Sequence, residues 1–424
     1  MEESPMKFKL KEIFYYIRAF AVWALMAAAV GAVCGVVGGA FAIVVEEATH
    51  LRQHVSWLPW LMPVAGLLIA GLYWLLKLPL SIGTDEIIKT VRTQEGVSIK
   101  MAPAIFISTA LTHLTGGSAG REGAALQLGG SIGVAMSHLM PSQGDNHRMF
   151  QLCGMAALFS ALFGTPLAAT IFVIEIIDIG KVNHRALLPC LISALTAKLV
   201  AMAIGAPAEV FPLASGLVEA NWLTLIQSAC VGLCCGAVAT AFCYLMHAAG
   251  RYMRKAIPND FLRIAFGGAT VALVTMALGL QDYQGSGMHT IVEALQGHAA
   301  PEAFLLKIVF TAMTLSVGFK GGEIVPSFFI GATLGCVVAP LLGFDPALGA
   351  GIGIIAMFCG VTNGALASMV LSVELFGAEY LPLFGIACAV SYALSGQVSL
   401  YHTQHFEEPK MGHRDAPAGD AHAA

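Results

Sequence analysis

Apolar stretches follow one another along nearly the whole chain. The first runs from about residue 19 to 45, and the others lie at about 59–77, 101–115, 149–178, 187–204, 222–247, 263–280, 303–317, 327–342, 347–375 and 381–396. A straight membrane-spanning helix needs about 20 such residues, so several stretches are too short for one span and others suffice for two. Glycine and proline interrupt many of them. This pattern predicts an all-α polytopic membrane protein with tilted and broken helices, as in transporters.

Composition agrees with a lipid bilayer as the surroundings of the chain. Of the 424 residues, 57% are hydrophobic and 11% are charged, whereas about a quarter of the residues of soluble domains are charged. The net charge of -4 gives no indication of nucleic-acid binding. The ten cysteines nearly all lie in apolar stretches and lack the spacing of a zinc or redox motif. We therefore expect them to be core residues and predict no metal or cofactor.

Basic residues ahead of the first apolar stretch predict the orientation of the chain. Lys7, Lys9, Lys11 and Arg18 favour a cytoplasmic N-terminus by the positive-inside rule. The stretch that follows is too long for the core of a signal peptide. We expect residues 1–18 to be a cytoplasmic segment and the polar residues 401–424 to be a disordered cytoplasmic tail.

The chain also resembles itself. The segment "GMAALFSALFGTPLAATIFVIEI" (residues 154–176) aligns without gaps to the segment that begins at residue 353, and Glu175 matches Glu374. At nearly the same offset, the G-x-x-G-x-E pattern of residues 117–122 recurs at residues 318–323, and residues 83–91 weakly resemble residues 287–295. These matches predict two membrane repeats, residues 19–205 and 206–400, with an anion or substrate site at their interface.

The stretch "GGSAGREGAALQLGG" (residues 116–130) places Arg121 and Glu122 between glycines in apolar surroundings. Gly120 and Gly123 allow the backbone to approach a ligand closely, and a helix is predicted to begin at Gly123. A helix N-terminus presents unpaired N–H groups and a positive dipole end, which attract anions. Deprotonated, Glu122 would occupy that site as a tethered anion, whereas a protonated Glu122 could swing away and admit a free anion. The alternative is a structural Arg–Glu pair in a loop between helices.

The stretch "GFKGGEIVPSFFIGATLG" (residues 318–335) has the same design. Gly321 and Gly322 free the backbone, Glu323 precedes a predicted helix, and Pro326 suits its first turn. Two carboxyls at symmetry-related helix starts would let a proton path and an anion path meet. Glu175 and Glu374 each end an apolar stretch and are expected to be interfacial or helix-packing residues.

One enzymatic motif competes with this interpretation. Residues 116–120 fit G-x-S-x-G, the nucleophile elbow of serine hydrolases, but that elbow needs a preceding strand. The segment "APAIFISTALTHLT" before it is predicted to be a membrane helix. The sequence therefore does not favour an enzyme.

"GREG" with its apolar "ALQLGGSIG" helix, followed by "FGTPLAATIFVIE", resembles the CLC family of chloride channels and anion/proton antiporters. The resemblance extends from about residue 20 to 404 and implies the CLC fold, with two inverted-topology repeats. It also implies a homodimer with one pore per subunit in a bacterial inner (plasma) membrane, with both termini cytoplasmic. Glu122 matches the gating glutamate, and Tyr401 in "SLYHT" matches a tyrosine that hydrogen-bonds the central anion.

The departures from the family pattern narrow the function. Ile82 stands for a serine that helps coordinate chloride, and Ile176 stands for the internal proton glutamate of chloride/proton exchangers. An apolar residue at position 82 together with "GFKGGE" resembles the bacterial fluoride/proton antiporter branch, although Val325 replaces the threonine of that branch. The resemblance thus implies fluoride export coupled to protons. A chloride channel or a chloride/proton exchanger of the same fold is the alternative.

These considerations give one set of candidate site residues. Gating and proton transfer are assigned to Glu122 and Glu323. The anion is expected to contact Gly120, Arg121, Gly123, Ile82, Gly83, Gly322, Ile324, Val325 and Tyr401.

Overall fold

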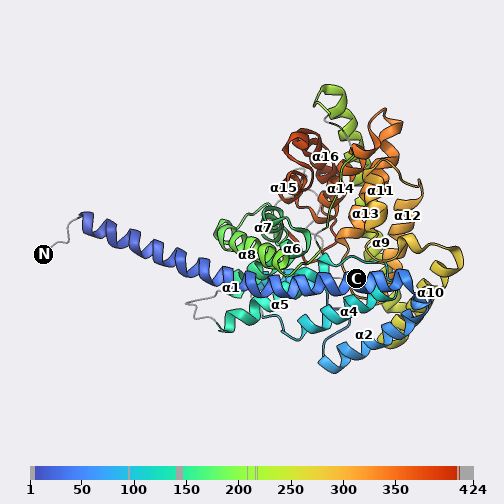
Figure 1. Ribbon diagram of the computed structural model, residues 1–424, viewed down its shortest axis with the longest axis horizontal. Coiled ribbons are helices and arrows are strands. Elements are labelled where there is room, and N and C mark those ends of the chain that lie inside the picture. Colours follow the sequence, from blue (N-terminus) through green and yellow to red (C-terminus); the bar gives the residue numbers. More distant parts are fainter. Residues whose placement is uncertain are drawn as a thin grey trace.

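The computed structural model describes residues 5–93, 96–139, 147–207, 209–214, 216, 218–407 and 410, with side chains from residue 13 onward. Within these residues the first half of the chain forms α1 (Pro5–His54), η1 (Leu58–Leu61), α2 (Met62–Leu76), α3 (Thr84–Thr93), α4 (Met101–Leu114), α5 (Glu122–Leu139), α6 (His147–Phe163), α7 (Pro166–Glu175), β1 (Asp178–Ile179) and α8 (His184–Ala203). Figure 1 shows that the N-terminal part of α1 projects away from the packed helices.

The second half continues the helical pattern. It forms α9 (Trp222–Ala256), α10 (Asp260–Leu278), η2 (Gln281–Tyr283), α11 (Met288–Leu295), α12 (Ala303–Ser316), α13 (Ile324–Leu341), α14 (Pro346–Thr362), α15 (Ala365–Phe376), η3 (Ala378–Tyr380), α16 (Leu381–Leu394) and β2 (His405–Phe406). The two short strands pair in parallel, so part of the predicted tail, Tyr401 to Glu407, is built into the fold.

Helix length separates two kinds of element, as the sequence predicts. The stretches Ile13–His54, Leu58–Leu76, His184–Ala203, Trp222–Ala256, Asp260–Leu278 and Ile324–Leu341 are long and apolar enough to cross a membrane. Other apolar helices, such as α4, α7 and α15, are too short for a straight span. The chain is a multi-pass membrane protein of broken and tilted helices, which confirms the predicted fold class.

Glycines bring two equivalent helix pairs into close contact. A Cβ atom added to Gly129 of α5 would lie 2.2 Å from the carbonyl oxygen of Gly154 in α6. In the second half, a Cβ on Gly331 of α13 would lie 2.2 Å from the carbonyl oxygen of Gly353 in α14. Small residues at these positions let the backbones touch, a common way to pack helices in membranes.

Two glutamates connect the halves reciprocally. The carboxylate of Glu175, at the end of α7, accepts hydrogen bonds from the N–H groups of Leu366 (3.0 Å) and Ala367 (2.8 Å) in the first turn of α15. Glu374, near the end of α15, accepts from Leu167 (3.1 Å) and Ala168 (2.7 Å) in the first turn of α7. Each glutamate thereby satisfies unpaired donors of the other helix. The prediction that these residues have a helix-packing role is confirmed.

Candidate functional site

The two glycine-rich stretches meet at the centre of the molecule. Gly120 and Gly322 form an isolated antiparallel bridge, and each donates its N–H to the other's carbonyl oxygen at 2.7 Å. Helix α5 begins at Glu122, one residue earlier than predicted, and α13 begins at Ile324. The bridge therefore fixes two helix N-termini beside each other.

Glycine is required at this meeting point. A Cβ on Gly322 would lie 2.3 Å from the backbone nitrogen of Gly123. A Cβ on Gly120 would lie 2.7 Å from the Glu122 carboxylate and 3.1 Å from Cβ of Val325. Side chains at either glycine would force the two helix starts apart, so the predicted close backbone approach is here between the two halves of the chain.

Glu122 is fully buried beside the start of its own helix. Its Oε2 accepts a hydrogen bond from the backbone N–H of Arg121 at 2.9 Å. Its Oε1 lies 3.6 Å from Nε of Arg121 and has no hydrogen-bond partner among the described residues. The carboxyl is thus held at the N-terminus of α5 by one hydrogen bond, with one oxygen left for a further donor.

Arg121 is buried as well, and its partner is a residue that the sequence did not single out. Its Nη2 lies 3.1 Å from Oε1 of Glu209, in the segment between α8 and α9, and its Nη1 donates to the carbonyl of Ala42 at 3.5 Å. The side chain of Glu209 is 6% exposed. A lone carboxyl in the apolar segment "GAPAEVFPL" was the signal available in the sequence.

Glu323 occupies the equivalent position in the second half. It is the N-cap residue of α13 and is half-buried, but its Oε2 atom is buried and has no hydrogen-bond partner in the described part of the chain. That oxygen lies 3.2 Å from where a Cβ of Gly123 would be, so the carboxyl points at the first turn of α5. Each helix start therefore has a carboxyl next to it with one buried oxygen that lacks a partner among the described residues.

Lys320 fixes the loop that carries Ile82. Its Nζ donates to the carbonyl oxygens of Leu80 (2.6 Å) and Ile82 (2.8 Å) and lies 4.6 Å from the ring centroid of Tyr73. In the sequence this lysine is part of "GFKGGE", and nothing in that motif indicates its contacts. Its role in joining the second repeat to the loop before α3 follows from tertiary structure alone.

A small cavity of about 130 Å³ gives access to Glu323 from one side. Ile82 and Gly83 line it as expected, together with Thr84 and Gln127, and the basic side chains Lys320, Arg254 and Arg263 contribute positive charge. Ile324 and Val325 are fully buried in the first turn of α13 and do not line this cavity. Three basic side chains therefore line the same cavity as the Glu323 carboxyl.

Tyr401 lies near Glu323 and is buried. Its backbone N–H donates to Oγ of Ser399 at 3.1 Å, but its hydroxyl has no hydrogen-bond partner within the described ranges. A buried hydroxyl without a partner is costly and usually binds water, an ion or a ligand. The hydroxyl is therefore available as a donor to an anion.

The other side of the site opens through two adjoining cavities. One, of about 330 Å³, is lined by Arg121, Glu209, His113 and the α1 residues Glu46 and His50. The second, of about 530 Å³, shares with it the residues Thr49, Gln53, Ser286 and Met288. The larger cavity is lined by Pro59, which precedes α2 in the chain, and the Glu323 cavity is lined by Leu80, which follows α2. The two cavities therefore lie at opposite ends of this helix. The cavity beside Arg121 and the cavity beside Glu323 thus lie on opposite sides of the site.

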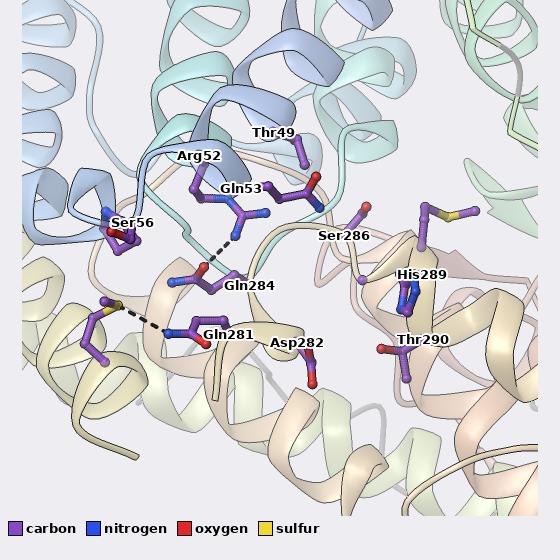
Figure 2. A pocket seen from close by; sticks show the side chains of 14 residues that line it. Thr49, Arg52, Gln53, Ser56, Gln281, Asp282, Gln284, Ser286, His289 and Thr290 are labelled. Atoms are coloured by element: carbon purple, nitrogen blue, oxygen red, sulfur yellow. Dashed lines mark hydrogen bonds between the residues drawn. The ribbon is translucent and has the colours of Figure 1, made fainter. Parts of the chain in front are cut away.

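Figure 2 shows how the larger cavity is built. The Arg52 guanidinium points at the side-chain oxygen of Gln284 and also donates to the carbonyl of His113 at 3.2 Å. Gly285, the residue after Gln284, is hydrogen-bonded to the stretch that precedes Glu122. Its carbonyl accepts from the N–H of Ala119 (3.2 Å), and its N–H donates to the carbonyl of Gly117 (3.0 Å). This polar network supports the Glu122 stretch from the second half of the chain.

The structure also shows the surroundings of Ser118 and of the cysteines. Ser118 follows α4 and its hydroxyl lies 3.2 Å from that of Thr311, so the G-x-S-x-G pattern has the helical context expected and not that of a nucleophile elbow. All ten cysteines are free thiols. Among the described residues, no group of three or more His, Cys, Asp or Glu side chains could hold a metal ion.

Comparison with known proteins agrees with this geometry. Residues 73–396 match the family described as voltage gated chloride channel. A "Chloride/fluoride channel protein" of Pseudomonas syringae pv. tomato is 35% identical over 97% of this chain and 92% of that protein. A crystal structure of a CLC-type fluoride/proton antiporter superposes with a TM-score of 0.87 at 31% identity, covering 92% of this chain and 99% of that one. A cyanobacterial Cl-/H+ antiporter shares the fold, with a TM-score of 0.75 at 19% identity over 88% and 94% of the two chains.

Proposed function

The chain belongs to the voltage-gated chloride channel family, or CLC family, and on that premise we propose that it is a fluoride/proton antiporter. It is an anion transporter with the CLC fold. In the proposed mechanism Glu122 and Glu323 carry protons, and the anion binds between the starts of α5 and α13.

The observation that carries the proposal is the placement of Glu323. Its carboxyl points at the first turn of α5, where the first N–H groups of a helix attract an anion. A deprotonated Glu323 thus competes with a free anion for the same place, and so does Glu122 from the other side. Because the deprotonated carboxyl and the anion exclude each other, protons and anions move in exchange.

The basic residues of the small cavity support entry of a free anion from the Glu323 side. Lys320, Arg254 and Arg263 create a positive potential that raises the local anion concentration. Further in, the hydroxyl of Tyr401 offers a donor that no described residue uses. Backbone N–H groups near Gly123 and Ile324 complete the proposed donor set.

Fluoride is the proposed anion because the site offers close, fixed donors and lacks a hydroxyl at Ile82. Fluoride holds its water tightly, so a selective site must replace that water with strong donors. The names of the relative and of the structural neighbour quoted above support this choice. Val325 stands where the fluoride/proton antiporter branch has a threonine, so this chain lacks a hydroxyl next to the site. This difference favours a chloride channel or a chloride/proton exchanger, and the experiment below therefore includes chloride.

Reconstituted liposomes distinguish the candidates. Vesicles loaded with equal concentrations of fluoride or chloride are diluted into anion-free buffer, and anion efflux and proton uptake are recorded together. We expect fluoride to leave faster and to draw protons inward, and Glu122→Gln to abolish proton uptake. Equal efflux of the two anions would contradict fluoride selectivity, and fluoride efflux without proton uptake would identify a channel.

The topology and assembly belong to the same proposal. We propose cytoplasmic termini in a bacterial inner membrane, residues 19–205 and 206–400 as the repeats, and a homodimer with one pore per subunit. The basic N-terminal segment and the reciprocal Glu175 and Glu374 contacts support the orientation and the repeats. Cross-linking in native membranes is expected to give a dimer, and a result with monomer alone would contradict it.

A further inference from the structure

Glu209 has the properties of a second proton carrier on the Glu122 side. Its carboxyl is inside the protein, with 6% of the side chain exposed, yet it lines the cavity of about 330 Å³ together with Arg121, the residue next to Glu122. It reaches Glu122 through a common partner, because Arg121 contacts Glu209 at 3.1 Å and Glu122 at 3.6 Å. The two carboxyls are within hydrogen-bonding reach of each other.

The hydrogen-bonding pattern of this group is the one expected if the two carboxyls share one proton. Glu122 Oε2 and Glu209 Oε1 already have donors, from the backbone of Arg121 and from its guanidinium. The remaining oxygens, Glu122 Oε1 and Glu209 Oε2, have no hydrogen-bond donor in the described part of the structure. Two carboxylates repel each other and neither can donate, whereas a single proton between them supplies a donor. One guanidinium and one carboxylate then balance in charge.

We propose that Glu209 passes protons between the Glu122 carboxyl and the water of the adjoining cavity. A hydronium ion of the cavity gives its proton to Glu209 and remains as water, the O–H bond at Glu209 then breaks as one forms at Oε1 of Glu122, and the negative charge moves to Glu209. Arg121 contacts both carboxyls, so the charge moves without losing its counter-ion. Neutral Glu122 loses its attraction to the N-terminus of α5 and leaves the anion site.

The surroundings of the cavity agree with this step. Burial raises the pKa of the Glu209 carboxyl above its ordinary value, against the opposing effect of the Arg121 guanidinium. The titratable groups that face the carboxyl are Glu46 and His50 from α1 and His113 from α4, and Glu46 raises the pKa further. Glu46 lines the same cavity but forms no hydrogen bond or ion pair with Arg121 or Glu122 in the described part of the chain, which makes it a matched control.

The inference rests on the proposed proton coupling, and the first test is a flux measurement. Glu209→Gln is compared with Glu46→Gln in liposomes, with anion and proton flux recorded separately. We expect Glu209→Gln to lower proton flux roughly tenfold or more, and Glu46→Gln to change it far less, because Glu46 acts on Glu209 only through its charge. Adding Glu209→Gln to Glu122→Gln should have no further effect, because both act in one step. Equal proton flux in wild type and Glu209→Gln would overturn the proposal.

A second measurement is independent of transport and separates the two proposals. Infrared titration of the purified protein follows the C=O band of protonated carboxyls. We expect the band that Glu122→Gln removes to shift or disappear in Glu209→Gln, and Glu209→Asp to restore it in part. Thermal unfolding of each variant checks that it is folded. An unchanged band in folded Glu209→Gln would refute the shared proton, whereas a wild type without proton flux would refute only the antiport.

Discussion

Gly120 and Gly322 exchange both of their backbone hydrogen bonds at 2.7 Å, and this bridge fixes the distance between the starts of α5 and α13. The bridge explains why the two halves of the chain carry the same glycine pattern. Since each half contributes one helix start and one carboxyl, the site exists only where the halves meet. Atoms added between the starts of α5 and α13 are therefore expected to change the geometry of the site.

Gly322→Ala is expected to disrupt the site. The added Cβ would lie 2.3 Å from the nitrogen of Gly123, a contact with rigid backbone. Overpacking of this kind costs about 1–3 kcal/mol, and the helix starts must move apart. Thermal unfolding in detergent should show a lower midpoint, and anion flux should fall. Gly71→Ala on α2, where a Cβ meets no atom within 4 Å, is the control and should behave as wild type.

The reciprocal glutamates give a prediction on stability. Glu175→Ala removes two hydrogen bonds from the first turn of α15, at a cost of about 1.5–3 kcal/mol because charged acceptors bind strongly. Glu374→Ala should have a similar effect on α7. Thermal unfolding measures both, with the exposed Glu379→Ala as reference.

Glu175 also tests how the family pattern applies to this chain. It stands next to Ile176, at the position where chloride/proton exchangers have two consecutive glutamates. Its two oxygens are both engaged by backbone N–H groups, so it is not free to carry protons. We expect the ratio of protons to anions to be unchanged in Glu175→Ala, and a changed ratio would show that Glu175 takes part in coupling.

Sequence reasoning located the carboxyls at the helix starts but missed their tertiary partners. The glycines around Glu122 and Glu323 and the apolar helix after each are local features, so the starts of α5 and α13 were predicted within one residue. Glu209 and Lys320 are different, because their contacts with Arg121 and with the loop at Ile82 join segments far apart in the chain. The pairing of His405 with Asp178 was missed for the same reason.

Lys320 provides a prediction on transport rate. Lys320→Met removes two charge-assisted hydrogen bonds to the loop at Ile82 and one cation from the small cavity. A loss of about 1.5–3 kcal/mol in positioning corresponds to a roughly tenfold or larger fall in anion flux. Lys320→Arg keeps the charge and should retain more activity than Lys320→Met. Equal flux in the two variants would show that the charge at this position is unimportant.

Tyr401→Phe tests whether the anion uses the hydroxyl that no described residue engages. Removing the hydroxyl breaks no hydrogen bond among the described residues, so the variant should unfold at the wild-type temperature or above it. A hydrogen bond to a charged ligand is worth about 1.5–3 kcal/mol, so fluoride should bind roughly tenfold more weakly or worse in calorimetry. The contrasting variant is Tyr380→Phe, which loses a hydrogen bond to the carbonyl of Gly216 at 3.3 Å and lies at the start of α16. It should keep the wild-type affinity, and an unchanged affinity in Tyr401→Phe would place the anion elsewhere.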